Sequence, residues 1–253
     1  MHKKHLLTFL LLPIVALIGF IEPAFAQENL LNIDVDDDLL SSRRIFQLIM
    51  LITVLSLAPS IVMMVTSFTR IVIVLSFLRT AMGLQNTPPN VVLISLAMFL
   101  TLFIMAPTLE TAYDEGVGPY LEDRITEQQA VTRTIAPFRT FMGAQVGDSE
   151  LDLFVGMLNE PPENMETVED VPLQALIPAF MITELRRAFE IGFLLFLPFL
   201  VIDLAVASIL MSMGMMMLPP VIISLPFKVV FFVLIDGWQL LTRSLVESFN
   251  VNI

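Results

Sequence analysis

Apolar and polar stretches alternate along the first half of the chain in a pattern that predicts membrane helices. Ile45 to Val65 is apolar over about the length that crosses the hydrocarbon core of a bilayer. Apolar character resumes from Ile71 to Leu78, and a third apolar segment runs from Val91 to Ala106, ending near Pro107. The Pro88-Pro89 pair between these segments breaks the helix, because proline lacks an amide donor and disfavours helix in the residue before it.

The second half repeats this arrangement. Apolar sequence runs from Ala188 to Leu218, the Pro219-Pro220 pair breaks it, and Val221 to Leu241 is the last apolar segment. An arginine pair opens each half, Arg43-Arg44 in the first and Arg186-Arg187 in the second. The shared order of arginines, apolar segment, prolines and second apolar segment indicates two related helical hairpins.

The segment between the hairpins is acidic. Glu110 to Asp170 contains 14 aspartates and glutamates against three arginines, so it should be exposed to water. Within it, Arg124 to Met142 favours a helix that Pro137 would kink or end. Aromatic side chains such as Phe141 and Phe154 interrupt the acidic sequence, and they either build a small core or anchor a contact between subunits.

The N-terminus has the three parts of a secretory signal peptide. Lys3 and Lys4 precede an apolar stretch from Leu6 to Phe20, and Ala24-Phe25-Ala26 forms the small-x-small pattern of a cleavage site. We therefore expect cleavage after Ala26. The alternative is an uncleaved first membrane helix.

These patterns predict an all-α, membrane-associated protein with two long helical hairpins broken at Pro-Pro turns. The expected order is a signal peptide (1–26), an acidic N-terminal segment (27–44), a first hairpin (45–109), an acidic extracytoplasmic region (110–185) and a second hairpin (186–253). A cleaved signal places the arginine pairs outside the cytoplasm, against the preference for positive charge inside. This conflict indicates that the hairpins are held within a larger protein assembly, where neighbours satisfy the charges.

Composition narrows the class of function. Of the 253 residues, 56% are hydrophobic, which is too apolar for an ordinary soluble domain, and the net charge of −12 argues against nucleic-acid binding. The chain has no cysteine, and both histidines, His2 and His5, lie in the predicted signal peptide. The mature chain therefore lacks Ser-His and Cys-His nucleophile pairs and zinc ligands of the usual kind, so we expect no catalytic, cofactor-binding or metal-binding residue.

A run of methionines precedes the second proline pair. Methionine has three soft torsions and a polarizable sulfur, so it repacks at low cost. If copies of the chain meet around an axis, the run becomes a ring of flexible thioethers that closes a pore yet yields to a passing chain. The alternative is a lipid-facing or core helix end that is rich in methionine. The candidate gate residues are Met211, Met213, Met215, Met216 and Met217.

Four charged residues lie deep in apolar sequence, Arg70, Asp203, Lys228 and Asp236. Ionised groups are costly in hydrocarbon, so such residues usually face protein, water or a partner. Ion pairing between helices is one interpretation, and a role in transport or gating is the other. The aspartates lack the Gly-x-Gly-Asp context of intramembrane aspartyl proteases, whereas a proton-coupled transporter stays open as an alternative.

Several strings in the chain resemble the signatures of one family. They are Ser67 to Arg79, Phe199 to Leu204, Gly214 to Pro220, Leu225 to Lys228 and Asp236 to Leu240. In these strings, and in its cleaved signal, the chain resembles the FliP family of flagellar biosynthesis and export proteins. The injectisome counterpart, SctR, shares the core pattern, but the acidic insert and the signal peptide favour the flagellar member.

This resemblance implies a ring, pentameric in the family, that assembles with FliR and FliQ in the export gate of the flagellar type III secretion apparatus. The ring would lie in the bacterial inner membrane at the flagellar basal body, with a periplasmic portion, and would pass unfolded flagellar proteins. Other export proteins and the proton gradient would supply the energy. The family's methionine constriction corresponds to Met215, Met216 and Met217. Contacts between neighbouring subunits are expected at Phe141, Phe154 and Glu184.

Overall fold

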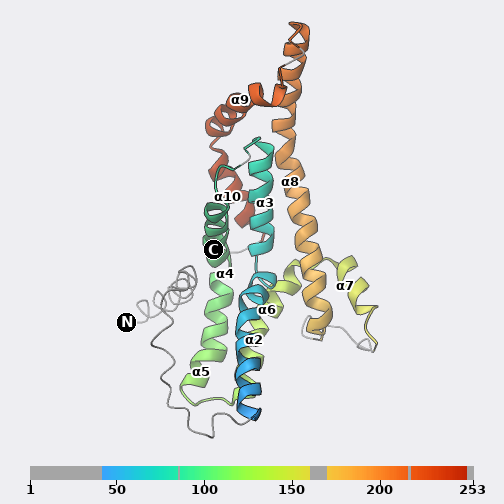
Figure 1. The fold of residues 1–253 in the computed structure, drawn as a ribbon. Coiled ribbons are helices and arrows are strands. Elements are labelled where there is room, and N and C mark those ends of the chain that lie inside the picture. The colour runs from blue at the N-terminus through green and yellow to red at the C-terminus, as the bar shows by residue number, and fades with distance from the viewer. Residues whose placement is uncertain (1–41, 85, 160–169, 216–217, 250–253) are drawn as a thin grey trace, which may run out of the picture. The chain divides into compact units, whose positions relative to one another are not determined.

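The computed structural model describes residues 42–84, 86–159, 170–215 and 218–249. Every regular element in these ranges is a helix (Figure 1), which confirms the all-α fold class. The predicted signal peptide and all but the end of the acidic N-terminal segment lie outside the described residues. The chain divides into two compact units, Met1–Ser56 and Leu57–Ile253, and every tertiary contact discussed below lies within the second.

The first predicted hairpin contains three helices. They are α2 (Ser42–Met64), α3 (Phe68–Ala81) and α4 (Asn90–Ala112). Helix α3 ends where Gly83 adopts a positive φ of 77°, and the amide of Leu84 donates to the carbonyl of Arg79 at 3.2 Å. This pattern satisfies the last carbonyl groups of the helix, and glycine adopts the left-handed conformation without steric cost. Pro89 is then the N-cap residue of α4.

The second predicted hairpin is turned in the same way. Helix α8 (Leu173–Ser212) ends where Gly214 has a φ of 73°, and the amide of Met215 donates to the carbonyl of Leu210 at 3.0 Å. Pro219 is the N-cap residue of α9 (Pro220–Leu234), and α10 (Gly237–Glu247) follows. Both tips therefore carry a Met-Gly helix end followed by a Pro-Pro helix start, Met82-Gly83 in the first and Met213-Gly214 in the second.

Short helices fill the acidic region. A π-helical turn η2 (Tyr113–Val117) leads from α4 into α5 (Gly118–Leu121), and α6 (Glu127–Gln145) and α7 (Asp148–Val155) come next. Thr126 and Gln129 form a reciprocal capping box that fixes the start of α6. A buried cluster between α6, α7 and the first part of α8 includes Met142, Leu176 and Phe180.

Three predicted boundaries differ from the structure. Helix α4 continues through Pro107 to Ala112, and α6 continues through Pro137 to Gln145. Proline removes one amide donor, but its fixed φ is compatible with a helix, and packing on either side maintains both helices. The long helix α8 begins at Leu173 rather than near residue 186, because its first turns place an apolar face, not an uninterrupted apolar run, against α6 and α7.

A fourth difference lies in the last apolar segment. The stretch expected to run from Val221 to Leu241 is broken at Ile235-Asp236 into α9 and α10, whose axes differ by 64°. Asp236 stands in the left-handed region with a φ of 51°, which ends one helix and begins the next.

The lengths and composition of the helices fit a membrane protein. Asn90–Leu121 and Leu173–Ser212 are each long and apolar enough to cross a membrane, and up to four spans result if each of two bent helix pairs counts as one. The helices α3, α4, α8, α9 and α10 share one hydrophobic core cluster, with Ile71, Val74 and Leu78 of α3 at its centre.

Candidate functional site

A fully buried arginine connects four helices near the middle of the core. Arg70 of α3 directs Nε to Glu184 Oε2 of α8 at 2.9 Å, and its Nη2 donates to Oε1 of the same carboxylate. Its Nη1 donates at 3.0 Å to both the carbonyl and the hydroxyl oxygen of Ser248, and Nη2 also donates to Gln145 Oε1 at 3.3 Å. The guanidinium carbon lies 3.7 Å from the ring centre of Phe249.

These five residues, Arg70, Gln145, Glu184, Ser248 and Phe249, are called the Arg70 cluster below. All five N–H groups of the guanidinium have an acceptor, so the charge is paired and fully hydrogen-bonded although it has no exposed surface. The cluster ties the C-terminal ends of α6 and α10 to the first turn of α3 and the N-terminal half of α8. The acidic region and the C-terminal helix are therefore both anchored to α3 and α8.

Sequence patterns predicted the environment of Arg70 correctly but not that of Glu184. Arg70 was expected among the buried charges, and it is buried. Glu184 was expected at a contact between subunits, but its carboxylate is fully buried inside the chain and binds Arg70. The reason is that α8 begins earlier than expected, so Glu184 lies in the core-facing part of a helix rather than at the end of an exposed region. Gln145 and Ser248 carried no sequence signal, because polar residues at helix ends are common.

A second polar cluster lies between α3, α8 and α9. Lys228 Nζ lies 2.6 Å from Asp203 Oδ2 and donates to the carbonyl oxygen of Ala81 at 3.1 Å. The hydroxyl of Ser224 donates to the other oxygen of Asp203. We call Ala81, Asp203, Ser224 and Lys228 the Lys228 cluster. Lysine is well placed here, because the last carbonyl groups of α3 carry the negative end of the helix dipole.

The Lys228 cluster resolves a pairing that the sequence left open. Lys228 pairs with Asp203 and not with Asp236. Asp236 is exposed, and no hydrogen bond or ion pair joins it to the rest of the described chain through its side chain. The expectation that Asp236 is a buried charge is therefore wrong for the isolated chain, because the break between α9 and α10 turns this residue outward.

The candidate gate lies at the free tip of the second hairpin. Met211, Met213 and Met215 are all exposed, and a Cβ atom added at Gly214 would meet no other atom within 4 Å. Met216 and Met217 lie outside the described residues. At about 1.5 Å per residue, the 40 residues of α8 extend about 60 Å, roughly twice the hydrocarbon thickness of a bilayer. The structure thus presents thioethers at the end of a very long helix, where nothing in the described chain covers them.

The tip of the first hairpin is covered instead. A Cβ atom added at Gly83 would lie 3.9 Å from Val221 and 4.0 Å from Lys228, and Met82 beside it is buried. The two tips share their local structure but differ in environment. One is fixed against α9, and the other is free to contact whatever surrounds the protein.

The aromatic residues expected between subunits are partly buried. Phe141 packs on Phe180 with ring centres 6.0 Å apart and on Phe249 at 6.1 Å. Phe154 packs against the cluster between α6, α7 and α8. Each retains some exposed surface. Their role between subunits stays a prediction, because both already contribute to the core of the chain.

Outside the long helices, the carboxylate of Glu150 has two polar partners. The hydroxyl of Ser149 donates to Glu150 Oε2 at 2.9 Å, and Arg186 Nη1 lies 2.6 Å from Oε1. The Ser149 hydrogen bond and, more weakly, the Arg186 charge lower the pKa of Glu150 below its ordinary value. The pair connects α7 to α8 at the surface.

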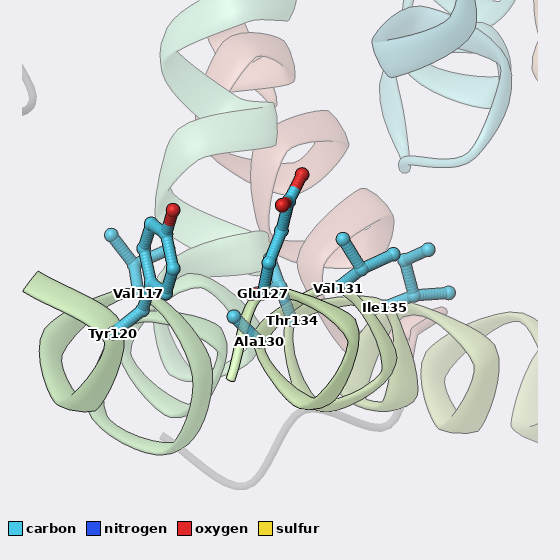
Figure 2. A pocket seen from close by; sticks show the side chains of 7 residues that line it. All are labelled: Val117, Tyr120, Glu127, Ala130, Val131, Thr134 and Ile135. Carbon is cyan, nitrogen blue, oxygen red and sulfur yellow. The ribbon is translucent and has the colours of Figure 1, made fainter. Parts of the chain in front are cut away.

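An open hollow of about 380 Å³ lies between α5 and α6 (Figure 2). Its lining residues are Val117, Tyr120, Glu127, Ala130, Val131, Thr134 and Ile135. One carboxylate among mostly apolar side chains offers no nucleophile, base and orienting group together, so this hollow has no catalytic arrangement. Within the described ranges, no group of three or more histidine, cysteine, aspartate or glutamate side chains is placed to hold a metal ion.

Comparison with known proteins gives one consistent result. The model of the FliP family matches residues 51–245. The flagellar biosynthetic protein FliP of Caulobacter vibrioides (strain ATCC 19089 / CIP 103742 / CB 15) is 56% identical over 231 residues, which cover 91% of this chain and 86% of the relative. The protein of the same name from Agrobacterium fabrum (strain C58 / ATCC 33970) is 58% identical over 200 residues, 79% of this chain and 82% of the relative. That of Bacillus subtilis (strain 168) is 51% identical over 203 residues, 80% and 91% of the two chains.

Proposed function

Because this chain belongs to the FliP family of flagellar biosynthetic proteins, we propose that it is a subunit of a flagellar protein export channel in the bacterial inner membrane. Several copies, five by the family resemblance, form a ring that assembles with FliR, FliQ and other export proteins. The ring passes unfolded flagellar proteins, and the acidic region faces the periplasm. The energy for export comes from its partners.

The exposed methionine tip is the observation that supports this proposal most directly. Thioethers at a free helix end repack around objects of different shape at low cost. When several copies bring their tips to one axis, Met215, Met216 and Met217 close the channel against ions, with Met211 and Met213 beside them. The constriction then opens for a passing chain by rearranging side chains rather than helices.

Assembly with other subunits is supported by the apolar surface that the chain leaves uncovered. On the C-terminal half of α8, Phe193, Leu194, Val201 and Leu204 are exposed in the isolated chain. Helix α9 likewise exposes Val230, Val233 and Leu234 among others. Such a surface requires lipid or protein around it. Neighbouring copies would cover part of it, whereas Arg186 and Arg187 already have polar partners, Glu150 and Gln145, within the chain.

The two polar clusters have a structural role in this proposal. The Lys228 cluster holds α9 and α8 against the end of α3, and the Arg70 cluster holds α8 in register with α3, α6 and α10. Ion pairs of this kind maintain the relative positions of helices that carry little polar surface otherwise. The pairing of Asp203 with Lys228 supports this reading over the proton-coupled transporter, in which a free carboxylate would exchange protons.

Ion leak and export measured together test the gate. Alanine in place of Met215, Met216 and Met217 should raise the ion permeability of membranes that contain the assembled channel and should alter flagellar protein export, because alanine is too short to close the passage. Met157→Ala is the matched control, since Met157 is also exposed but lies in the acidic region after α7. Unchanged leak and export in the tip variant would refute the gate.

The mass of the detergent-extracted protein tests the ring. A particle of several copies is expected, and a stable monomer would contradict a self-assembled ring. A variant with Asp203 neutralised tests the transporter alternative. Small-solute uptake that requires both this carboxylate and a proton gradient would favour a transporter over an export channel.

A further inference from the structure

The structure separates the methionines of this chain into accessible and inaccessible groups in a way that bears on the gate. At the free tip, Met211, Met213 and Met215 are 61%, 66% and 43% exposed. At the covered tip, Met82 occupies the position equivalent to Met213 and is 4% exposed. Met105 in α4 and Met142 in α6 are each only 1% exposed. Accessibility thus differs by more than tenfold between two positions with the same local backbone.

From this distribution we propose that the three exposed tip methionines form a site of reversible oxidation, and that their conversion to sulfoxides opens the closed channel to ions. The inference rests on the proposed gate. It assigns to the gate a chemical modification that the export function itself does not require.

The reaction needs only a peroxide as the oxygen-atom donor. The lone pair of the thioether sulfur attacks one oxygen of hydrogen peroxide, the O–O bond breaks, and a sulfoxide and water are formed. Sulfur is oxidised by two electrons and the peroxide is reduced by two. Because the chain contains no cysteine, no thiolate competes for the oxidant, and methionine is the sulfur target of the chain.

The product has properties opposite to those the gate needs. A sulfoxide is polar and accepts hydrogen bonds from water, whereas a thioether is apolar and flexible. A constriction that excludes water through an apolar lining becomes wettable when its side chains carry sulfoxide oxygens. Ion leak should therefore increase without any change in the width of the channel.

The location of the site allows oxidation of the tip without unfolding of the protein. Helix α8 has already ended at Ser212, and the surroundings of Gly214 are empty within 4 Å, so sulfoxide oxygens there displace no packed neighbour. Oxidation of Met105 or Met142 would instead place a polar group in a closed core and require local unfolding. The tip is therefore oxidised in the folded protein, and enzymatic reduction of the sulfoxides restores the original surface.

Mapping the oxidised residues tests the site independently of the gate. The full chain in membrane vesicles from cells that produce the assembled export complex is treated with hydrogen peroxide, digested and analysed by peptide mass spectrometry. Sulfoxide should form at Met211, Met213 and Met215 on the order of tenfold faster than at Met82, Met105 and Met142, in proportion to accessibility. Equal rates at the tip and in the core would overturn the proposal.

Ion leak across the same vesicles tests the consequence. Peroxide should increase the leak several-fold over untreated vesicles, and added methionine sulfoxide reductases should reverse it. The variant with leucine at positions 211, 213 and 215 should leak less after peroxide than the unsubstituted chain, because leucine is apolar and cannot be oxidised. The control Met157→Leu should respond like the unsubstituted chain, since Met157 is 66% exposed but lies outside the tip.

The outcomes distinguish this proposal from the gate on which it rests. If the tip is oxidised and the leak does not change, or if the leucine variant leaks as strongly as the unsubstituted chain after peroxide, the oxidation switch is refuted. The gate itself stands or falls by the alanine variants, whose leak is measured without any oxidant.

Discussion

Removing both partners of the Arg70–Glu184 pair should destabilise the protein by clearly less than the sum of the losses from removing each partner alone. The perturbation is Arg70→Met or Glu184→Met, each of which replaces a charged side chain by an apolar one of similar length. In either variant the remaining charge stays inside the core, because both side chains have no exposed surface. A buried charge without its counterion is the most costly product of a single substitution in a core.

The magnitude follows from the geometry of the cluster. Loss of one partner from a buried ion pair costs about 3–5 kcal/mol. Arg70→Met also leaves the carbonyl of Ser248 without its donor, whereas Gln145 keeps a hydrogen bond from Arg187 at 2.8 Å. The double variant removes both charges and retains the volume. The decrease in its free energy of unfolding should therefore be smaller, by at least about 2 kcal/mol, than the sum of the decreases in the two single variants.

Chemical unfolding in detergent micelles, followed by far-ultraviolet circular dichroism, measures these differences. The matched control is the exposed pair Arg243–Glu247, which has the same residue types at a separation of 2.7 Å but side chains that are 75% and 61% exposed. Substituting either of its members should leave the midpoint of unfolding almost unchanged, because solvent screens the pair.

Two results would refute this reasoning. Single substitutions at the Arg70 cluster that cost no more than those at the exposed pair would mean that the buried pair does not hold the helices together. If the double variant loses as much free energy of unfolding as the two single variants together, the two charges do not interact, although they lie within hydrogen-bonding distance.

Three further predictions follow from individual contacts. Gly192→Ala should destabilise the protein by about 1–3 kcal/mol, because the new Cβ would lie 2.6 Å from the ring of Phe77, and a second substitution Phe77→Leu should recover much of the loss in the same unfolding assay. Asp236→Gly should be tolerated while Asp236→Ala lowers the thermal midpoint, because the backbone there is left-handed; equal midpoints would contradict a conformational role. The free energy of unfolding should decrease as the pH falls below the ordinary glutamate value of 4.5 and through the lowered pKa of Glu150, since the Ser149 hydrogen bond favours the ionised form in the folded state; Glu150→Gln should flatten that part of the pH profile.

Residue patterns were sufficient where a property depends on neighbours in sequence. The apolar segments alone were enough to predict an all-α protein with helices able to cross a membrane. The proline pairs gave the turns. Patterns were insufficient where a helix is maintained by packing. An apolar segment was expected to end near Pro107, and Pro137 was expected to kink or end a helix. Both helices continue, because one missing amide bond costs less than the loss of the buried contacts on either side.

Partners far apart in sequence account for the other errors. Glu184 and Asp236 are both acidic residues near apolar sequence, and nothing local distinguishes them. The fold places Glu184 against Arg70, 114 positions away, and turns Asp236 outward at a left-handed residue. The charge of a residue and the hydropathy of its neighbours in sequence show that it needs a counterion or water. Only the tertiary structure decides which of the two it meets.

The sequence by itself determined that this chain forms apolar helices with methionines before a proline pair, because helix periodicity, proline stereochemistry and side-chain chemistry are local properties. Only the tertiary structure decided that the tip at Gly83 is covered by α9 while the tip at Gly214 is free. Both tips have the same Met-Gly helix end, so the local backbone cannot distinguish them. The difference arises from the long-range bond between Lys228 and the carbonyl of Ala81, which joins residues 147 positions apart.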